Sequence, residues 1–156
     1  MDFAPGADCK CGAMQLNLKT DYSLRLLLFA ATHSGEVVPV GKVAEVFGIS
    51  AHHLTKVARS LGDLGLVELV RGRSGGVRLA CDPAQVRVGE VVRLIEGSGA
   101  LVECFDARRN RCVISPVCGL KGALREAQAA FFEVLDRYTL AELTRNQAQL
   151  RRLLPL

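Results

Sequence analysis

Three of the six cysteines lie in one short segment of this 156-residue chain. Cys104, Cys112 and Cys118 are separated by seven and then five residues, and the segment is flanked by two stretches with helical patterning. Thiolates are soft ligands that suit zinc and iron–sulfur clusters, and they also form disulfides under oxidising conditions. The segment therefore predicts either metal binding or redox chemistry.

A structural zinc site and a disulfide framework are disfavoured. Structural zinc sites usually combine closely spaced cysteine pairs into four protein ligands, whereas this segment has three cysteines and no nearby histidine. The acidic N-terminus lacks the basic and apolar regions of a secretory signal, so we expect a cytoplasmic protein with reduced thiols rather than a disulfide framework. The residues alone leave an iron–sulfur cluster and a thiol–disulfide switch as equal alternatives.

The other three cysteines are given no functional role. Cys81 follows a predicted strand, and we expect it to be a small buried thiol. Cys9 and Cys11 lie in a segment, residues 1–13, without apolar periodicity, which predicts a flexible extension. Two cysteines cannot complete a metal site, so we expect exposed thiols there. Met14 is a candidate start of the remaining domain.

Composition limits the classes of function. Apolar residues make up 49% of the chain and charged residues 23%, which is typical of one ordinary domain or a small domain with an appendage. The longest apolar run, residues 26–31, is far shorter than the roughly 20 residues that a membrane span needs. A net charge of +4 suggests an anionic partner. No paired carboxylates, phosphate loop or H-E-x-x-H motif is present, so we do not expect an enzyme.

The elements before residue 80 have the order of a winged helix-turn-helix. Helices are predicted from Thr20 or Asp21 to Gly35, from Pro39 to Gly48, and from a cap at Ser50 to residue 64. Two short β-type runs follow at residues 66–70 and 76–80, joined by the glycine-rich turn "RGRSGG". The predicted fold is mainly α with a small β hairpin.

Two further helices are predicted after the hairpin. The stretch "VRVGEVVRLIEG" ends at Gly97, and a long amphipathic helix follows the cysteine segment. The apolar stripe of that long helix recurs every three or four residues and comprises Leu120, Leu124, Ala127, Phe131, Leu135 and Tyr138. The preceding module is too small to cover this stripe, which favours pairing with a second copy in a homodimer. The predicted divisions are 1–13, 14–80 for DNA binding, and 81–156 for the cysteine loop and dimerisation.

The third helix and the hairpin carry the candidate DNA contacts. The second helix of a helix-turn-helix enters the major groove, and a basic hairpin suits the minor groove. Hydrogen-bond donors gather on the outer helix face and at the hairpin. The predicted DNA-binding residues are Ser50, His52, His53, Lys56 and Arg59 on the helix, and Arg71, Arg73 and Arg78 at the hairpin tip.

Several motifs occur in an order that resembles a known family. "MQLNLKTDYSLRLLLF", "VAEVFGISAHHLTKV", "LVRGRSGGVRLA", the three-cysteine loop and "LDRYTLAEL" are similar to the NsrR-type repressors, which sense nitric oxide. These repressors belong to a winged-helix family that also contains the iron–sulfur regulator IscR. The resemblance covers residues 14 to about 149. It implies a homodimer that binds palindromic operators on double-stranded DNA and releases them when a cluster is nitrosylated or lost.

The resemblance also implies a set of cluster ligands. Cys104, Cys112 and Cys118 would bind the cluster, and Asp21 from the partner subunit would complete it. Three cysteines and an aspartate point to one [4Fe-4S] cluster per subunit, although [2Fe-2S] fits the same ligand count. IscR-like relatives use a histidine just after the last cysteine, whereas Cys118 is followed by "GLKGA". The alternatives are a cluster-free thiol–disulfide repressor and an iron- or cluster-status regulator of the IscR type.

Overall fold

The computed structural model describes residues 16–72, 74–97 and 101–156. The predicted extension at residues 1–13, with Cys9 and Cys11, lies outside the described residues, as does Arg73 of the hairpin. Within the described part of the chain, no helix is long and apolar enough to cross a membrane.

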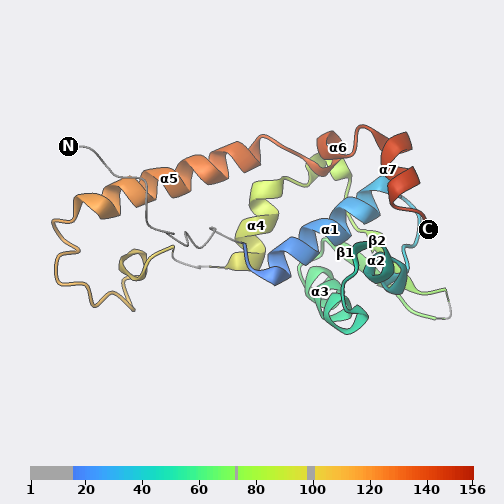
Figure 1. Cartoon of the computed structure of the whole chain (residues 1–156), viewed down its shortest axis with the longest axis horizontal. Coiled ribbons are helices and arrows are strands. Elements are labelled where there is room, and N and C mark those ends of the chain that lie inside the picture. Colours follow the sequence, from blue (N-terminus) through green and yellow to red (C-terminus); the bar gives the residue numbers. More distant parts are fainter. Residues whose placement is uncertain (1–15, 73, 98–100) are drawn as a thin grey trace, which may run out of the picture.

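Helix α1 (Leu18–Thr32) forms the centre of the fold (Figure 1). Leu26, Leu27 and Phe29 are completely buried in the main hydrophobic core. The buried hydroxyls of Ser23 and Thr32 donate hydrogen bonds to backbone carbonyls one turn earlier, at 2.7 and 2.8 Å. These local bonds remove the cost of burying a hydroxyl group, so α1 can be packed on several sides.

The start of α1 differs from the sequence prediction. The helix begins after Asn17, whose side-chain oxygen accepts a hydrogen bond from the backbone N–H of Thr20 at 2.9 Å. Thr20 is fully buried in the first turn, and Asp21 follows it there. The prediction placed the start of the helix at Thr20 or Asp21 instead. Asn17 takes the role because its side chain is also fixed from a second helix, as described below.

Helices α2 (Val40–Phe47) and α3 (Ala51–Asp63) form the predicted helix-turn-helix. Helix α2 ends at Gly48, whose φ of +63° is favourable only for a residue without Cβ. The turn then buries Ile49, and Ser50 is the N-cap of α3, although its side chain makes no capping hydrogen bond. The buried face of α3 is the predicted one, comprising Leu54, Val57, Ala58 and Leu61.

Strands β1 (Val67–Val70) and β2 (Gly76–Leu79) form an antiparallel hairpin in which Val67 pairs with Leu79. The hairpin is attached to the segment before α2 by an isolated bridge between Val38 and Val77. Their backbones exchange hydrogen bonds of 2.7 and 2.9 Å. This approach is so close that a Cβ on Gly76 would overlap the carbonyl group of Val38. The hairpin is therefore held in place through backbone contacts that require glycine.

Helix α4 (Val88–Glu96) follows the short 3₁₀ turn η1 (Pro83–Gln85) and packs against α1. It buries Val88, Val91, Val92 and Ile95 and ends at Gly97, as predicted. A second 3₁₀ turn, η2 (Glu103–Phe105), lies at the start of the cysteine loop.

The long helix α5 (Gly119–Asp136) confirms the prediction of an extended helix after the cysteine loop. None of its residues is buried within the single chain, and Leu120 of the apolar stripe is 66% exposed. Figure 1 shows the cysteine loop and the adjoining part of α5 extending away from the rest of the molecule. Pairing of this stripe with a second copy stays a prediction.

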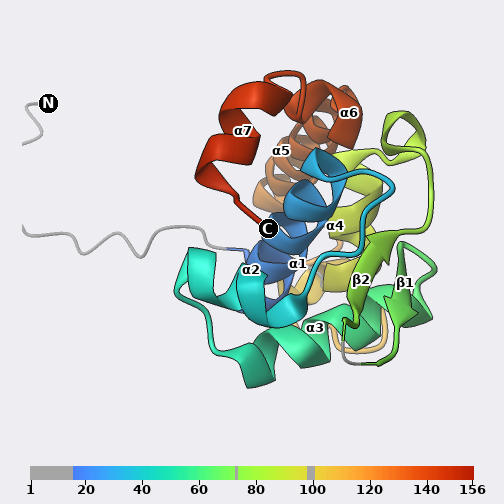
Figure 2. The same ribbon diagram turned by 90° about the vertical axis from the view of Figure 1, so that its right-hand side faces the viewer.

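Two short C-terminal helices, α6 (Leu140–Leu143) and α7 (Gln147–Leu153), were not predicted. The chain returns to the body through a bridge between Arg87 and Thr139. Leu140 is completely buried and Leu154 nearly so, in the same core as α1. The core is thus shared by residues before and after the predicted boundary at residue 80. Figure 2 shows α6 and α7 on one side of α1, and the hairpin and α3 on other sides.

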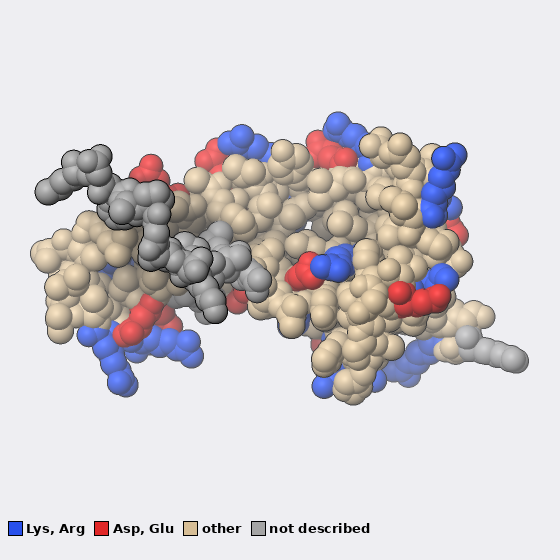
Figure 3. Space-filling view, in the orientation of Figure 1, with Lys and Arg blue, Asp and Glu red and all other residues tan. Residues whose placement is uncertain are grey.

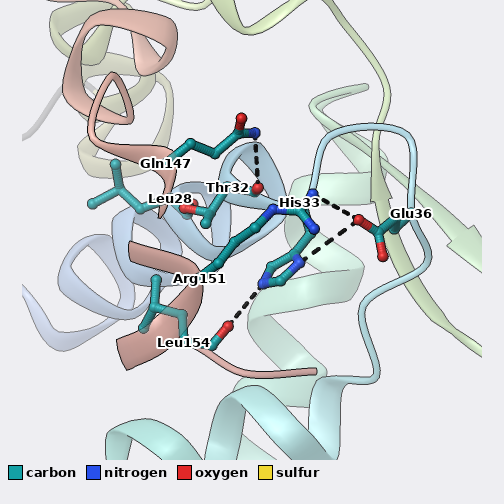
Figure 4. A network of polar contacts seen from close by, with 7 residues as sticks. All are labelled: Leu28, Thr32, His33, Glu36, Gln147, Arg151 and Leu154. Atoms are coloured by element: carbon teal, nitrogen blue, oxygen red, sulfur yellow. Dashed lines mark hydrogen bonds and ion pairs between the residues drawn. The ribbon is translucent and has the colours of Figure 1, made fainter. Parts of the chain in front are cut away.

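A polar network fastens α7 to the end of α1 (Figure 4). Nε2 of the buried His33 lies 2.7 Å from the carbonyl oxygen of Leu154. Arg151 forms an ion pair with Glu36 at 2.7 Å, and the side-chain amide of Gln147 donates to the last carbonyl of α1 at 3.1 Å. These contacts hold the C-terminal segment against the winged-helix body.

Candidate DNA interface and cysteine loop

The outer face of α3 carries all five helix residues predicted to contact DNA. Ser50, His52, His53, Lys56 and Arg59 are exposed, opposite the buried Leu/Val face. Within the described ranges, neither Lys56 nor Arg59 forms an ion pair, so both cations are available to an anionic ligand. The arrangement matches that of a recognition helix, in which exposed donors face base edges and phosphates.

The hairpin presents two of its three predicted arginines among the described residues. Arg71 is exposed directly after β1. Arg78 is not at the tip but within β2, opposite Glu68, with which it forms an ion pair at 2.9 Å. Exposed pairs of this kind are weak and exchange readily for a phosphate. Figure 3 shows Lys and Arg at several places on the surface, including the lower edge where α3 and the hairpin lie.

A groove of about 420 Å³ separates the start of α1 from α3. Its lining is mainly apolar, with basic side chains from both helices. The lining residues are Leu18, Lys19 and Tyr22 from α1, and His53, Lys56, Val57 and Ser60 from α3. Two of the predicted DNA-binding residues therefore adjoin the first turn of α1, which also carries Asp21.

The three loop cysteines are free thiols in a largely exposed segment. Cys104 lies in the 3₁₀ turn η2, Cys112 follows a turn and is exposed, and Cys118 is the N-cap of α5. The backbone N–H groups at a helix N-terminus favour a negatively charged group, such as a thiolate ligand, at that position.

Polar residues that were not predicted hold this loop in shape. The buried hydroxyl of Ser115 contacts the side chains of Asn110 and Lys121 at 3.0 and 2.9 Å. The carboxylate of Glu103 accepts a hydrogen bond from the backbone N–H of Arg111 at 2.6 Å. Spacing gave no signal for these contacts, because asparagine and serine in a loop are equally typical of solvated turns.

Asp21 lies in the first turn of α1 with a half-exposed side chain. It forms an ion pair with Arg25 at 2.8 Å, one turn later in the same helix. Across residues 16–72, 74–97 and 101–156, no three His, Cys, Asp or Glu side chains are gathered as metal ligands. Asp21 and the three thiols are therefore not brought together within one chain.

The donor set nevertheless fits an iron–sulfur cluster in its chemistry. The three thiols are free, they belong to one loop, and they are the soft ligands that iron–sulfur clusters use. The ion pair of Asp21 is an exposed one between neighbouring turns, which contributes little and can be exchanged. The three thiols would supply three of the four ligands that such a cluster takes.

The expectation for Cys81 is wrong. Cys81 is exposed rather than buried, and its Sγ lies 3.6 Å from the carbonyl oxygen of Gly65. The reason is its position: β2 ends at Leu79, so Cys81 belongs to the turn beyond the strand and not to its inward-facing side.

A charged contact that was not predicted joins α4 to the end of α5. The Arg93 guanidinium of α4 forms a two-pronged ion pair with Asp136 at the end of α5, and it also stacks 4.6 Å from the Phe132 ring centroid. The hydrogen bonds from Arg93 hold the pKa of Asp136 below its usual value and raise that of Arg93. The end of α5 that is distant from the cysteine loop is therefore joined to the last turn of α4.

Comparison with known proteins identifies similar regulators. The chain is 51% identical over 144 residues to the HTH-type transcriptional regulator NsrR of Bacillus subtilis, covering 92% of this chain and 99% of that protein. It is also 51% identical over 142 residues to the NsrR of Geobacillus kaustophilus, covering 90% and 97%. The predicted resemblance to NsrR-type regulators is confirmed. These relatives are named as transcriptional regulators and not as enzymes.

Solved structures show the same fold. The IscR structure from T. potens superposes with a TM-score of 0.69 at 27% identity, covering 86% of this chain and 88% of that one. CymR of B. subtilis, described as the global cysteine regulator, gives a TM-score of 0.65 at 26% identity, covering 85% and 98%. The predicted winged-helix fold is confirmed.

Residues 16–146 match the Rrf2 family, described as iron-dependent transcriptional regulators. This match spans most of the chain and includes the helix-turn-helix, the hairpin, the cysteine loop and α5. The chain belongs to the Rrf2 family and is a DNA-binding transcriptional regulator of the NsrR kind.

Proposed function

We propose that this protein is a cytoplasmic homodimeric repressor that senses nitric oxide through an iron–sulfur cluster. The observation that carries the proposal is the set of three free thiols in one loop of a chain about half identical to regulators named NsrR. Cys104, Cys112 and Cys118 would hold one [4Fe-4S] cluster per subunit, and Asp21 of the partner subunit would complete its coordination. Such a cluster supplies an iron site that reacts with nitric oxide.

The DNA-binding part of the proposal depends on α3 and the hairpin. The exposed donors of α3 face a major groove, and Arg71 and its neighbours contact phosphates beside it. Two copies of α3 in a homodimer read the two halves of a palindrome only when their spacing matches one helical turn of DNA. A change in the position of α3 in either subunit therefore lowers the affinity for the whole operator.

Homodimerisation would use α5. Its apolar stripe is only partly covered within the described chain: Leu124, Phe131 and Leu135 are half-buried, whereas Leu120 is 66% exposed. Burial of such a stripe against its copy is the usual way in which a long amphipathic helix is stabilised. The same pairing would bring the loop of one subunit toward α1 of the other.

The position of Asp21 supplies the link between sensing and DNA binding. Asp21 lies in the first turn of α1, which borders the groove shared with His53 and Lys56 of α3. Binding of this carboxylate by the partner subunit's loop would fix the first turn of α1. Release of the carboxylate would leave Asp21 paired only with Arg25. An oxygen ligand is more easily displaced than a thiolate, which suits a site that must respond.

A thiol–disulfide repressor is the second candidate, favoured by the exposure of the Cys112 thiol. In that case oxidation would join two of the loop thiols without any metal. An iron- or cluster-status regulator would use the same residues with a different signal. The colour of the purified protein separates the first two candidates, because a cluster protein is brown and a disulfide switch is colourless. A nitric oxide sensor is separated from an iron- or cluster-status regulator by comparing the response to nitric oxide with the response to iron chelation.

The test uses DNA selected from a random duplex library by protein purified without oxygen. Stepwise addition of nitric oxide should lower the affinity of the wild-type protein, measured by fluorescence anisotropy, and Cys118→Ser should abolish the response. Cys81→Ser is the matched control, because it removes an exposed thiol outside the loop and should respond like wild type. An unchanged affinity of the wild-type protein after nitric oxide treatment would overturn the proposal.

The ligand role of Asp21 is tested separately. Asp21→Ala and Arg25→Ala both remove the ion pair between these residues, but only Asp21→Ala removes the oxygen ligand. We expect lower iron content and an altered nitric oxide response in Asp21→Ala and not in Arg25→Ala. Unaltered iron content, response and DNA affinity in Asp21→Ala would refute the cross-subunit ligand.

A further inference from the structure

Glu96, the last residue of α4, binds the start of α1 across nearly eighty residues of sequence. Its Oε1 accepts hydrogen bonds from the hydroxyl of Thr20 at 2.6 Å and from the backbone N–H of Asn17 at 3.2 Å. Its Oε2 accepts from the side-chain amide of Asn17 at 2.9 Å. One carboxylate thus receives three hydrogen bonds from the capping turn of a single helix.

These bonds determine the conformation of the cap. The Asn17 side chain uses its oxygen to cap α1 and its amide to contact Glu96, so the carboxylate fixes which way the amide points. Thr20 is completely buried, which leaves its hydroxyl without access to bulk water. A negative charge near a helix N-terminus is also favourable by itself. Loss of Glu96 would therefore loosen the first turn and leave the buried Thr20 hydroxyl with only its longer contact, 3.3 Å, to the Asn17 side-chain oxygen.

The first turn of α1, which Glu96 contacts, lies next to both the candidate ligand Asp21 and the groove beside α3. Asp21 follows Thr20 directly, while Leu18, Lys19 and Tyr22 line the groove beside the recognition helix α3. Glu96 itself is followed by Gly97, where α4 ends before the cysteine loop. Figure 1 shows the end of α4 beside the start of α1. A single side chain therefore joins the beginning of the loop to the turn that borders α3.

We propose that Glu96 is a positioning residue of the sensor, which holds the first turn of α1 so that Asp21 is presented to the partner subunit's loop. This inference rests on the proposed function, because it needs Asp21 as a ligand. It adds a route within one subunit: the loop is connected through Glu96 to the first turn of α1, and through that turn to His53 and Lys56 of α3. Each cysteine loop is thereby connected both to its own recognition helix and, through Asp21, to the loop of its partner.

The first test uses the full-length protein without metal. Glu96→Gln keeps the size of the side chain but removes its charge and one of its two acceptor oxygens. We expect backbone amides in the first turn of α1 to exchange hydrogen on the order of tenfold faster, with no change in α6. Glu90→Gln is the matched control, since Glu90 is an exposed carboxylate of the same helix with no hydrogen bond to the described residues. Unchanged hydrogen exchange of these amides in Glu96→Gln would overturn the inference that Glu96 holds the first turn of α1.

The second test separates positioning of Asp21 from general stabilisation. Iron content and the amount of nitric oxide needed to release DNA are measured for Glu96→Gln, for Asp21→Ala and for the double variant, all purified without oxygen. If Glu96 acts through Asp21, its substitution lowers iron content in the wild-type background and has no further effect in Asp21→Ala. Equal effects in both backgrounds would overturn the positioning role while leaving the proposed function intact. Wild-type protein that holds no iron would instead overturn the proposed function.

Discussion

Replacement of Gly76 by alanine should detach the hairpin from the helix-turn-helix. The new methyl group would overlap the carbonyl group of Val38 and lie within 2.9 Å of the Cα of Pro39, which are backbone atoms that cannot rotate away. Relief of the overlap requires separation of β2 from this segment and weakens the two hydrogen bonds between Val38 and Val77. Two such bonds contribute about 2 kcal/mol, and strain from overpacking adds about 1 kcal/mol or more. We expect the free energy of unfolding to fall by about 3 kcal/mol.

Gly41→Ala is the matched control, for which we expect the free energy of unfolding to rise instead of fall. Gly41 lies in the first turn of α2, has ordinary helical backbone geometry and has open space where a Cβ would be placed. Alanine there should stabilise the protein by about 0.5–1 kcal/mol, because it restricts the unfolded chain and favours the helix.

The assay is urea unfolding of the metal-free protein at one fixed concentration, because the stability of a dimer depends on concentration. DNA affinity is measured in parallel at a temperature where each variant is folded. Gly76→Ala should bind DNA more weakly than wild type, since the hairpin that carries Arg71 is no longer anchored to the segment before α2. A stability equal to that of Gly41→Ala would refute the inference that the hairpin is anchored through its backbone.

Three other predictions concern different parts of the molecule. Arg71→Ala combined with Arg73→Ala should lower the slope of log affinity against log salt by about 0.9 for each phosphate that the hairpin no longer neutralises, and an unaltered slope would exclude the hairpin from the interface. Asp136→Asn should lower the free energy of unfolding near neutral pH. Because the pKa of Asp136 lies below its usual value of 3.8, the difference in stability between wild type and variant should be complete above pH 3.8. It should disappear as the pH falls from 3.8 through the lowered pKa. Thermal unfolding across that range is the measurement, and a difference independent of pH would contradict the prediction. Leu140→Ala should cost about 2–5 kcal/mol in urea unfolding, and a decrease below about 1 kcal/mol would mean that α6 is not part of the common core.

Features governed by local rules could be predicted from the sequence. Gly48 and Gly97 end helices because glycine accepts a positive φ, and both ends were predicted at these residues. The buried face of α3 and the existence of the long helix α5 follow from helical periodicity, although Tyr138 of the predicted stripe lies just beyond the end of α5. These signals depend on neighbouring residues only, so no knowledge of tertiary contacts was needed.

Features decided by distant contacts could not be predicted. The cap of α1 is Asn17 because Glu96, far along the chain, orients its side chain. Helices α6 and α7 are too short to give a periodic signal, and they are stabilised by burial of Leu140 and by contacts such as that of His33 with Leu154. In the same way, sequence spacing contains no information about the ion pair between Arg93 and Asp136.

The candidate site also combines features that could be predicted from the sequence with features that could not. The three loop thiols and the exposed donors of α3 could be found by residue type and spacing. The proposed connection between them could not, because Glu96 and the first turn of α1 come together only in the folded chain.

The central claim is tested most directly by non-denaturing mass spectrometry of protein purified without oxygen, followed by stepwise addition of nitric oxide. We expect a dimer whose mass includes one [4Fe-4S] cluster per subunit and increases as nitric oxide is added. A colourless dimer without bound iron, obtained under careful exclusion of oxygen, would contradict the account and favour a thiol–disulfide switch at Cys104, Cys112 and Cys118.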